Sequence, residues 1–197
     1  MREMLNKSIL IELYIGEKKS MQEIANSFGF SLNTVSYWMQ KYKIPIRSRS
    51  EATYVKRNPD GDPFFFKQPE TPEDIQLFGI GIGLYWGEGN KKNLNSVRLG
   101  NTDPILIEKF MDFLVKIFGL NKTDLKFGLQ IFTDIDPEEA LDFWVKKLNI
   151  HRSQINKPVI TKSGSVGTYR KKSQYGVLTV MYHNKKLRDL LVNLLPL

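Results

Sequence analysis

The chain has 197 residues, with 29 lysines and arginines against 21 aspartates and glutamates and a formal net charge of +8, which favours a nucleic acid or another anionic partner. It contains no cysteine, which excludes disulfides and thiolate metal sites and favours an intracellular location. Because no secretion signal opens the chain and no apolar run reaches the length of a membrane span, we expect a soluble cytoplasmic protein that contacts no membrane.

The first predicted elements are three short helices that form a helix-turn-helix unit. Ser20 and Glu23 have the spacing of a capping box, Gly29 ends the helix that they open, and Ser31 caps the next helix. The predicted core of these two helices consists of Ile24, Ala25, Phe28, Phe30, Val35 and Trp38. A third helix, over residues 6–14, is expected to pack Ile9, Leu10 and Leu13 against this core. This spacing predicts a DNA-binding unit; a three-helix module that binds nothing is the alternative.

The outward face of the second helix of the pair carries short polar side chains, which suit base edges and phosphates. Its predicted DNA-binding residues are Ser31, Asn33, Thr34, Ser36, Tyr37 and Gln40. The segment KYKIPIRSRSEATYVKR follows, and we expect it to be an extended basic arm in which Arg47 and Arg49 contact DNA. A solvated basic linker is the alternative for this segment.

A change of composition divides the chain into two domains. We expect a helix-turn-helix domain with its arm over residues 1–58, a linker rich in Pro, Gly and Asp over 59–72, and a second domain over 73–197. The second domain opens with a helix that has Thr71 or the following acids at its cap and Pro72 at its first position.

Glycines are spaced four residues apart in this helix, although each interior glycine costs about 1 kcal/mol relative to alanine. They are Gly79, Gly83 and Gly87, and together they form a stripe of bare backbone that would let a second helix approach closely. The pattern lacks the spacing of a dinucleotide-binding loop and the Gly-Lys-Ser/Thr of a phosphate loop. The stripe therefore predicts a helix–helix interface.

The segment GIGLYWGEG, residues 81–89, resembles the LAGLIDADG motif of homing endonucleases. The resemblance implies an α+β fold, a saddle of αββαββα order, in which paired motif helices form the interface. It implies that Glu88, with Gly87 beside it, binds a catalytic Mg²⁺. Because the chain has a single motif, the resemblance implies a homodimer that binds a roughly palindromic site in double-stranded DNA.

The remaining elements follow the chain as strands and helices of this second domain. We expect a strand in SVRLGN, a helix capped by Asp103, a strand over 125–132, an inserted helix capped by Asp136, a strand in YGVLTVMYH and a closing helix in NKKLRDLLVNLL. The polar face of the sheet would contact DNA through Arg98, Lys126, Gln130, Lys162, Arg170, Lys171 and Lys172. A solvated surface charge is the alternative for each lysine. Lys126 and Arg170 are in addition candidates for stabilising the transition-state charge.

Two functions fit these expectations. One is a Mg²⁺-dependent, site-specific DNA endonuclease with Glu88 as the metal ligand. The other is a transcriptional regulator without catalysis, because the combination is also similar to sporulation regulators of Gram-positive bacteria, which join a LAGLIDADG-like domain to a helix-turn-helix. Trp86, at the motif's first acidic position, favours the regulator, whereas the retained carboxylate of Glu88 favours the enzyme.

Overall fold

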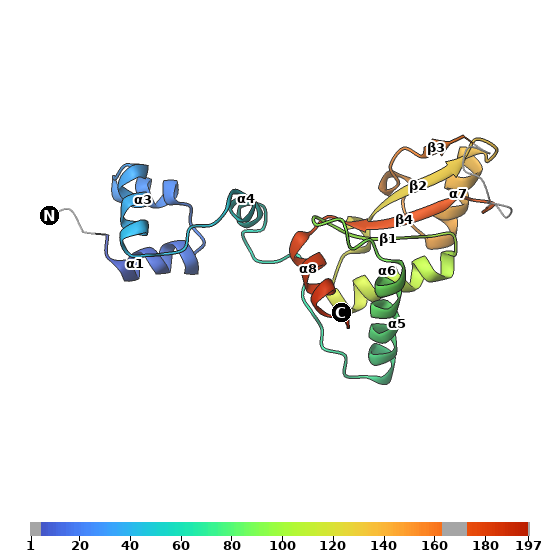
Figure 1. The fold of residues 1–197 in the computed structure, drawn as a ribbon, viewed down its shortest axis with the longest axis horizontal. Helices are drawn as coiled ribbons and strands as arrows, with labels where there is room; N and C mark the ends of the chain where they lie inside the picture. Colours follow the sequence, from blue (N-terminus) through green and yellow to red (C-terminus); the bar gives the residue numbers. More distant parts are fainter. Residues whose placement is uncertain (1–4, 163–172, 197) are drawn as a thin grey trace. The chain divides into compact units, whose positions relative to one another are not determined.

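The computed structural model describes residues 5–162 and 173–196, and the chain divides into two compact units, Met1–Pro63 and Phe64–Leu197 (Figure 1). The division falls inside the stretch 59–72 that the sequence marks as a linker. Within the described residues, no helix is long and apolar enough to cross a membrane.

The first unit is built from helices around a small core of its own. Its elements are α1 (Lys7–Ile11), the π-helical turn η1 (Glu12–Gly16), α2 (Met21–Phe28), α3 (Leu32–Lys41) and α4 (Arg49–Arg57). The predicted caps are confirmed: Ser20 and Glu23 form the capping box of α2, Gly29 ends it with a φ of 67°, and the Ser31 side chain caps α3.

The core of the first unit differs from the prediction at one position of α3. Ile24, Ala25 and Val35 are fully buried as expected, but the second anchor of α3 is Met39, which is fully buried, while Trp38 is only partly buried. Met39 lies four residues after Val35 and so points into the same core, whereas the Trp38 ring stacks on Tyr42 at 5.4 Å.

The predicted extended arm is wrong beyond residue 48, because helix α4 occupies its second half. Ser48 caps this helix, and its side chain and that of Glu51 form a second capping box. The sequence carries this signal as Ser-Arg-Ser-Glu, which is the Ser-x-x-Glu spacing that also marks α2. Arg49 is therefore the first residue of a helix and does not lie in an extended chain.

The second unit combines a four-stranded mixed sheet with helices, which confirms the α+β class. Its elements are α5 (Pro72–Glu88), β1 (Val97–Asn101), α6 (Pro104–Phe118), η2 (Lys122–Asp124), β2 (Lys126–Phe132), α7 (Pro137–Leu148), η3 (Arg152–Gln154), β3 (Val159–Thr161), β4 (Val177–Tyr182) and α8 (Lys185–Asn193). The strand order is β1-β4-β2-β3. β4 pairs antiparallel with both β1 and β2, and the edge strand β3 pairs parallel with β2.

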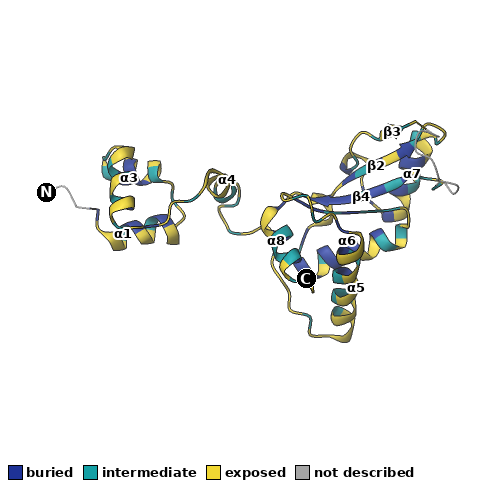
Figure 2. Cartoon of the chain, viewed as in Figure 1, coloured by how far each residue is buried: buried dark blue, intermediate teal, exposed yellow. Residues whose placement is uncertain are grey.

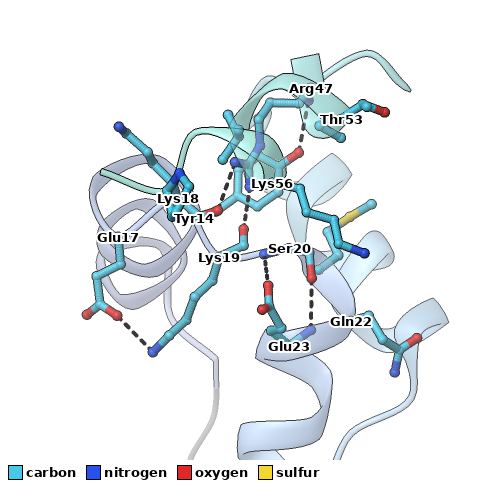
Figure 3. Close-up of a pocket in the computed structure, with 14 residues that line it drawn as sticks. Tyr14, Glu17, Lys18, Lys19, Ser20, Gln22, Glu23, Arg47, Thr53 and Lys56 are labelled. Atoms are coloured by element: carbon cyan, nitrogen blue, oxygen red, sulfur yellow. Dashed lines mark hydrogen bonds and ion pairs between the residues drawn. The ribbon is translucent and has the colours of Figure 1, made fainter. Parts of the chain in front are cut away.

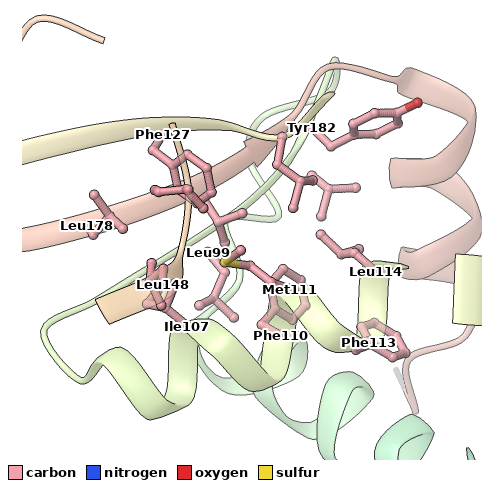
Figure 4. Packing of buried hydrophobic residues seen from close by; sticks show 14 of the residues in the cluster. Leu99, Ile107, Phe110, Met111, Phe113, Leu114, Phe127, Leu148, Leu178 and Tyr182 are labelled. Atoms are coloured by element: carbon pink, nitrogen blue, oxygen red, sulfur yellow. The ribbon is translucent and has the colours of Figure 1, made fainter. Parts of the chain in front are cut away.

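One face of the sheet packs on the helices to form the core of the unit (Figure 4). Leu99, Phe127 and Leu178 point from three strands toward α6, whose Ile107 and Phe110 lie beneath them. The sheet therefore exposes only its other face. Since side chains alternate between the two faces along a strand, every second residue of each strand points to this exposed face.

The order of elements departs from the predicted αββαββα plan in three places. A single strand, β1, lies between α5 and α6, and the second strand of the plan is reduced to an isolated bridge between Gly89 and Leu99. The segment 90–96 is rich in Asn, and the side chains of Asn90 and Asn93 accept bonds from backbone N–H groups of the turn, which replaces strand pairing.

The second departure is α7, which the sequence analysis treats as an insertion. Ala140 and Trp144 of α7 are fully buried in the same core as the sheet, and the Trp144 indole donates to the carbonyl of Tyr175 at 2.9 Å. The helix is thus an integral layer of the unit. The third departure is the strand β3, which is absent from the predicted elements. It is short and mostly exposed, so no alternation of buried and exposed residues marks it as a strand.

Candidate nucleic-acid interface

The exposed face of α3 carries polar side chains at helical spacing. Asn33, Tyr37 and Gln40 are exposed and Ser36 is partly buried, and within the described residues none of these four side chains has a hydrogen-bond partner. Their positions, three and four residues apart, place them in one stripe along the helix. The structure thus brings four of the six predicted α3 residues together as free donors and acceptors.

The other two predicted residues of α3 have a local structural role. The Ser31 hydroxyl accepts from the backbone N–H of Thr34 at 3.1 Å, and the two hydroxyls share a bond of 2.9 Å. Ser31 and Thr34 therefore fix the start of the helix, and their hydroxyls are partly satisfied before any ligand arrives.

Arg47 lies inside the first unit and not in an open arm (Figure 3). Its guanidinium stacks over the Tyr14 ring at 4.1 Å and donates to the carbonyls of Lys18, at 2.9 Å, and Lys19. Its backbone N–H also donates to the Tyr14 hydroxyl at 2.9 Å. These contacts occupy the guanidinium, so the predicted role of Arg47 as a DNA contact has no support in the geometry.

A cleft of about 730 Å³ lies beside Arg47, between the start of α2 and α4 (Figure 3). Lysines and glutamates both line it, and Lys19 pairs with Glu17 at 2.8 Å across the η1–α2 corner. Beyond the cleft, Arg49 of α4 is exposed, and its guanidinium has no partner within the described residues. The guanidinium of Arg49 is thus free to bind a ligand, whereas that of Arg47 is engaged within the unit.

The second unit presents an open face, defined as the sheet side that carries Arg98, Gly100, Lys126, Gly128, Gln130, Val177, Thr179 and Met181. Arg98 pairs with Met181, and Met181 pairs with Lys126, so the two cations flank one methionine in a single row across three strands. Since neighbouring strands are about 4.8 Å apart, the backbones of Arg98 and Lys126 are roughly 10 Å apart.

The other residues that are predicted to contact DNA from the sheet differ in their contacts. Gln130 is exposed, and its amide donates to the Thr161 hydroxyl at 3.3 Å. Lys162 is exposed just beyond β3 and makes an interaction within the unit. Arg170, Lys171 and Lys172 lie outside the described residues.

Glu88 is the last residue of α5, and the chain after it joins the edge of β1. The bridge between Gly89 and Leu99, with the Asn90 N–H donating to the Arg98 carbonyl at 2.9 Å, places the end of α5 beside the row that holds Arg98. The Glu88 carboxylate is exposed and has no partner within the described residues. The structure thus brings Glu88 and Arg98 to one corner of the sheet.

An ammonium group lies at the same helix end, which the sequence analysis missed. Lys91 donates to the carbonyl of Trp86 at 2.5 Å and lies 3.5 Å from that of Tyr85. A cation at the C-terminal carbonyls stabilises a helix. The sequence signal is a lysine just past the end of a helix, which is common and therefore weak.

Tyr85 lies next to this corner with its hydroxyl buried. The side chain is fully buried against Phe110, at 6.0 Å between ring centroids, and within the described residues the hydroxyl has no hydrogen-bond partner. Burial raises the pKa of Tyr85, with the charge of Arg188 acting in the opposite direction. The neutral Tyr85 hydroxyl is therefore a buried donor and acceptor that no other group in the described part of the chain satisfies.

The predicted glycine stripe is exposed. Gly79, Gly83 and Gly87 have no neighbouring atom within 4 Å of an added Cβ, and Ile75 and Trp86 of the same helix are exposed. Much of α5 is accordingly coloured as exposed in Figure 2. We name this surface, with Ile80 included, the glycine face of α5. The close approach within the unit is made instead by Gly81, whose added Cβ would overlap with the Phe113 ring of α6.

Comparison with known proteins gives no match: no protein-family model, no curated protein and no solved structure matches the chain. Among the described residues there is also no group of three or more His, Cys, Asp or Glu side chains that could hold a metal ion. The function is therefore inferred from the geometry.

Proposed function

We propose that this chain is a site-specific double-stranded DNA-binding protein and that it acts, as a homodimer, as a Mg²⁺-dependent endonuclease of the homing type. The observation that carries DNA binding is the free polar stripe of α3, held on a capped helix-turn-helix unit. A helix presented in this way suits the major groove, whose base edges offer donors and acceptors for Asn, Gln and hydroxyl groups.

The open face of the second unit supports a second contact area on DNA. Arg98 and Lys126 present positive charge without a carboxylate partner in the described residues, and the neighbouring row across the same three strands consists of the small residues Gly100, Thr179 and Gly128. Cations of this kind bind phosphates, and alternating polar side chains on strands can reach base edges.

The glycine face of α5 supports the homodimer. It combines bare backbone with exposed Ile75, Ile80 and Trp86, which are 57%, 39% and 51% exposed. Such a surface is costly in water and fits a close helix–helix contact with a second copy. In a two-fold dimer this contact would bring two Glu88 residues near one axis.

The oxygen ligands at the end of α5 fit half of a shared Mg²⁺ site. Glu88 offers a free carboxylate, and Gly87 offers one of the last carbonyls of the helix, which have no partner inside it. Mg²⁺ takes ligands of this kind, one or two carboxylates with further oxygens. When bound, the ion would activate water and neutralise phosphate charge; Lys126 of this chain would add positive charge beside the phosphate.

The alternative is a transcriptional regulator that binds DNA and does not cut it. The Lys91 ammonium, 2.5 Å from the Trp86 carbonyl, favours this alternative because it already supplies a positive charge where the metal would bind. Both functions share the DNA-binding surfaces and differ only in the chemistry at Glu88.

The two functions are separated by one experiment. Duplex DNA would be selected from a random pool in Ca²⁺, and Mg²⁺ would then be added to the enriched pool. We expect double-strand ends at a fixed position in a symmetric site, and we expect Glu88→Gln to abolish them while it retains binding. Glu108→Gln is the matched control, because Glu108 is an exposed glutamate on a different helix, α6.

The other outcomes are also informative. An enriched pool that stays intact in Mg²⁺ would make the protein a regulator. Cleavage by Glu88→Gln equal to that of the wild type would remove Glu88 as the metal ligand. A pool without enrichment would contradict DNA binding itself.

A further inference from the structure

The turn that joins α5 to β1, residues 89–96, contains no helix or strand, and it lies at the corner of the sheet that carries Glu88 and Arg98. A turn of this length needs donors for its carbonyls if it is to keep one conformation. In this chain the donors come from a residue almost a hundred positions later in the sequence.

Arg188 of α8 provides these donors. Its Nε donates to the Asn93 carbonyl at 3.1 Å, its Nη2 donates to the Lys91 carbonyl, and its Nη1 pairs with Asp189 at 2.9 Å. The side chain is only 12% exposed. A guanidinium can hold two carbonyls at fixed spacing because its donors form a rigid planar fork, which a lysine ammonium lacks.

From Asn93 a chain of hydrogen bonds continues to the open face. The Asn93 side-chain oxygen accepts from the Ser96 hydroxyl at 2.9 Å, and the Ser96 hydroxyl accepts from Nε of Arg98 at 2.8 Å. Ser96 is fully buried. The guanidinium of Arg98 is thus anchored through one nitrogen, while its other two nitrogens have no partner in the described part of the chain.

We propose that Arg188 is a positioning residue: it fixes the α5–β1 turn and, through Asn93 and Ser96, orients the guanidinium of Arg98 on the open face for a DNA phosphate or base. The DNA part of this inference rests on the proposed function. The part that concerns Arg98 is independent of it, because the hydrogen-bonded chain lies within the unit.

The first test follows the turn by ¹⁵N NMR of the full chain. In Arg188→Lys we expect the Nε–H signal of Arg98 to lose its protection from exchange with water and the amides of Asn90, Lys92 and Asn93 to exchange about tenfold faster or more. Amides between β2 and β4 should change by less than about twofold if the unit remains folded.

The second test is a double-mutant cycle on DNA affinity. In the wild-type background we expect Arg98→Gln to weaken binding about tenfold and to lower the salt slope by about one unit. In the Arg188→Lys background, Arg98→Gln should have less than about a twofold effect, because Arg98 is already misplaced. Arg188→Lys keeps the charge of the chain, so long-range electrostatics cannot produce this coupling between Arg188 and Arg98.

Arg152→Lys is the matched control. Arg152 also uses its guanidinium in two contacts, with Glu138 and Asp142 of α7, but these are exposed and lie outside the α5–β1 turn. We expect neither the turn amides nor the effect of Arg98→Gln to change in this variant.

Two results would overturn the inference: an unchanged Arg98 Nε–H signal in Arg188→Lys, or additive effects of the two substitutions on DNA affinity. A wild-type chain that binds no DNA would remove the proposed function, and the NMR signals would still decide whether Arg188 positions Arg98.

Discussion

Arg47 shows how a basic residue can be taken for a nucleic-acid contact when it is a structural one. Its guanidinium stacks on Tyr14 and donates to two carbonyls of the turn between η1 and α2, those of Lys18 and Lys19. Lys18 has a φ of 59°, so this corner has an unusual backbone conformation that the guanidinium holds in place.

We therefore expect Arg47→Lys to destabilise the first unit by about 1–3 kcal/mol, because the ammonium keeps the charge and loses the stacked fork. Hydrogen exchange of the amides in α1 and α2 measures this change in the full chain. Arg49→Lys is the control and should have little effect, since Arg49 is exposed. Equal exchange rates in both variants would contradict the structural role of Arg47.

The carboxylate of Asp189, which accepts hydrogen bonds from Lys185 and Arg188 on α8, makes the stability of the second unit depend on pH. The hydrogen bond from Lys185, and after it that from Arg188, holds the pKa of this carboxyl below its ordinary value of 3.8. A lowered folded-state pKa means that the carboxylate stabilises the fold above the pKa of the unfolded chain, and that this contribution is lost as the pH falls through the folded-state pKa.

We expect Asp189→Asn to flatten the acid side of the stability curve, in the region below about pH 4, with a small amplitude because the side chain is partly exposed. Urea unfolding at a series of pH values measures it. The wild-type chain is the comparison. An acid side that is equally steep in Asp189→Asn and in the wild type would contradict the assignment.

At the scale of the element, α5 has two glycine-bearing sides with opposite roles. Gly81 faces the Phe113 ring of α6 at a distance that leaves no room for a Cβ, whereas Gly83 faces open space. Propensity favours alanine at both positions by about 1 kcal/mol, so packing decides the sign of each substitution.

We expect Gly81→Ala to destabilise the second unit by about 1–3 kcal/mol and Gly83→Ala to stabilise the monomer by up to about 1 kcal/mol. Thermal unfolding measures both. Gly83→Leu should leave the monomer folded and abolish the homodimer in sedimentation. A Gly83→Leu chain that stays dimeric would show that the glycine face is not the interface.

At the scale of the whole molecule, the boundary between the units lies earlier than the sequence suggests. The backbone N–H groups of Phe65 and Lys67 donate to the carbonyls of Phe118 and Ile117 at the end of α6, and the Phe65 ring covers Gly119. Residues 64–67 therefore belong to the second unit, although they fall within the predicted linker 59–72.

We expect residues 64–197 to fold alone and to lose most of the DNA affinity and part of the salt slope, because the α3 stripe and the cations near it are removed. Circular dichroism and DNA titrations at several salt concentrations measure this. A chain that starts at residue 73 is the matched comparison and should be less stable than 64–197. An unchanged affinity of 64–197 would place DNA binding elsewhere than in the first unit.

The sequence by itself determined the local features of this protein. Capping boxes, the left-handed Gly29, the helix starts at Pro72, Pro104 and Pro137 and the alternation of β2 depend on neighbours within a few residues, so they follow from the pattern. The exposed polar stripe of α3 follows in the same way, because helical periodicity assigns its face.

Only the tertiary structure decided which residues share a site. That Arg47 is engaged by Tyr14, that α7 joins the core and that Arg188 reaches the turn after α5 depend on contacts between residues far apart in the chain. A sequence pattern gives the face of a helix or strand, but not what lies against it. What lies against that face depends on tertiary packing, because the same arginine can donate to two backbone carbonyls of its own chain or remain free to bind a phosphate.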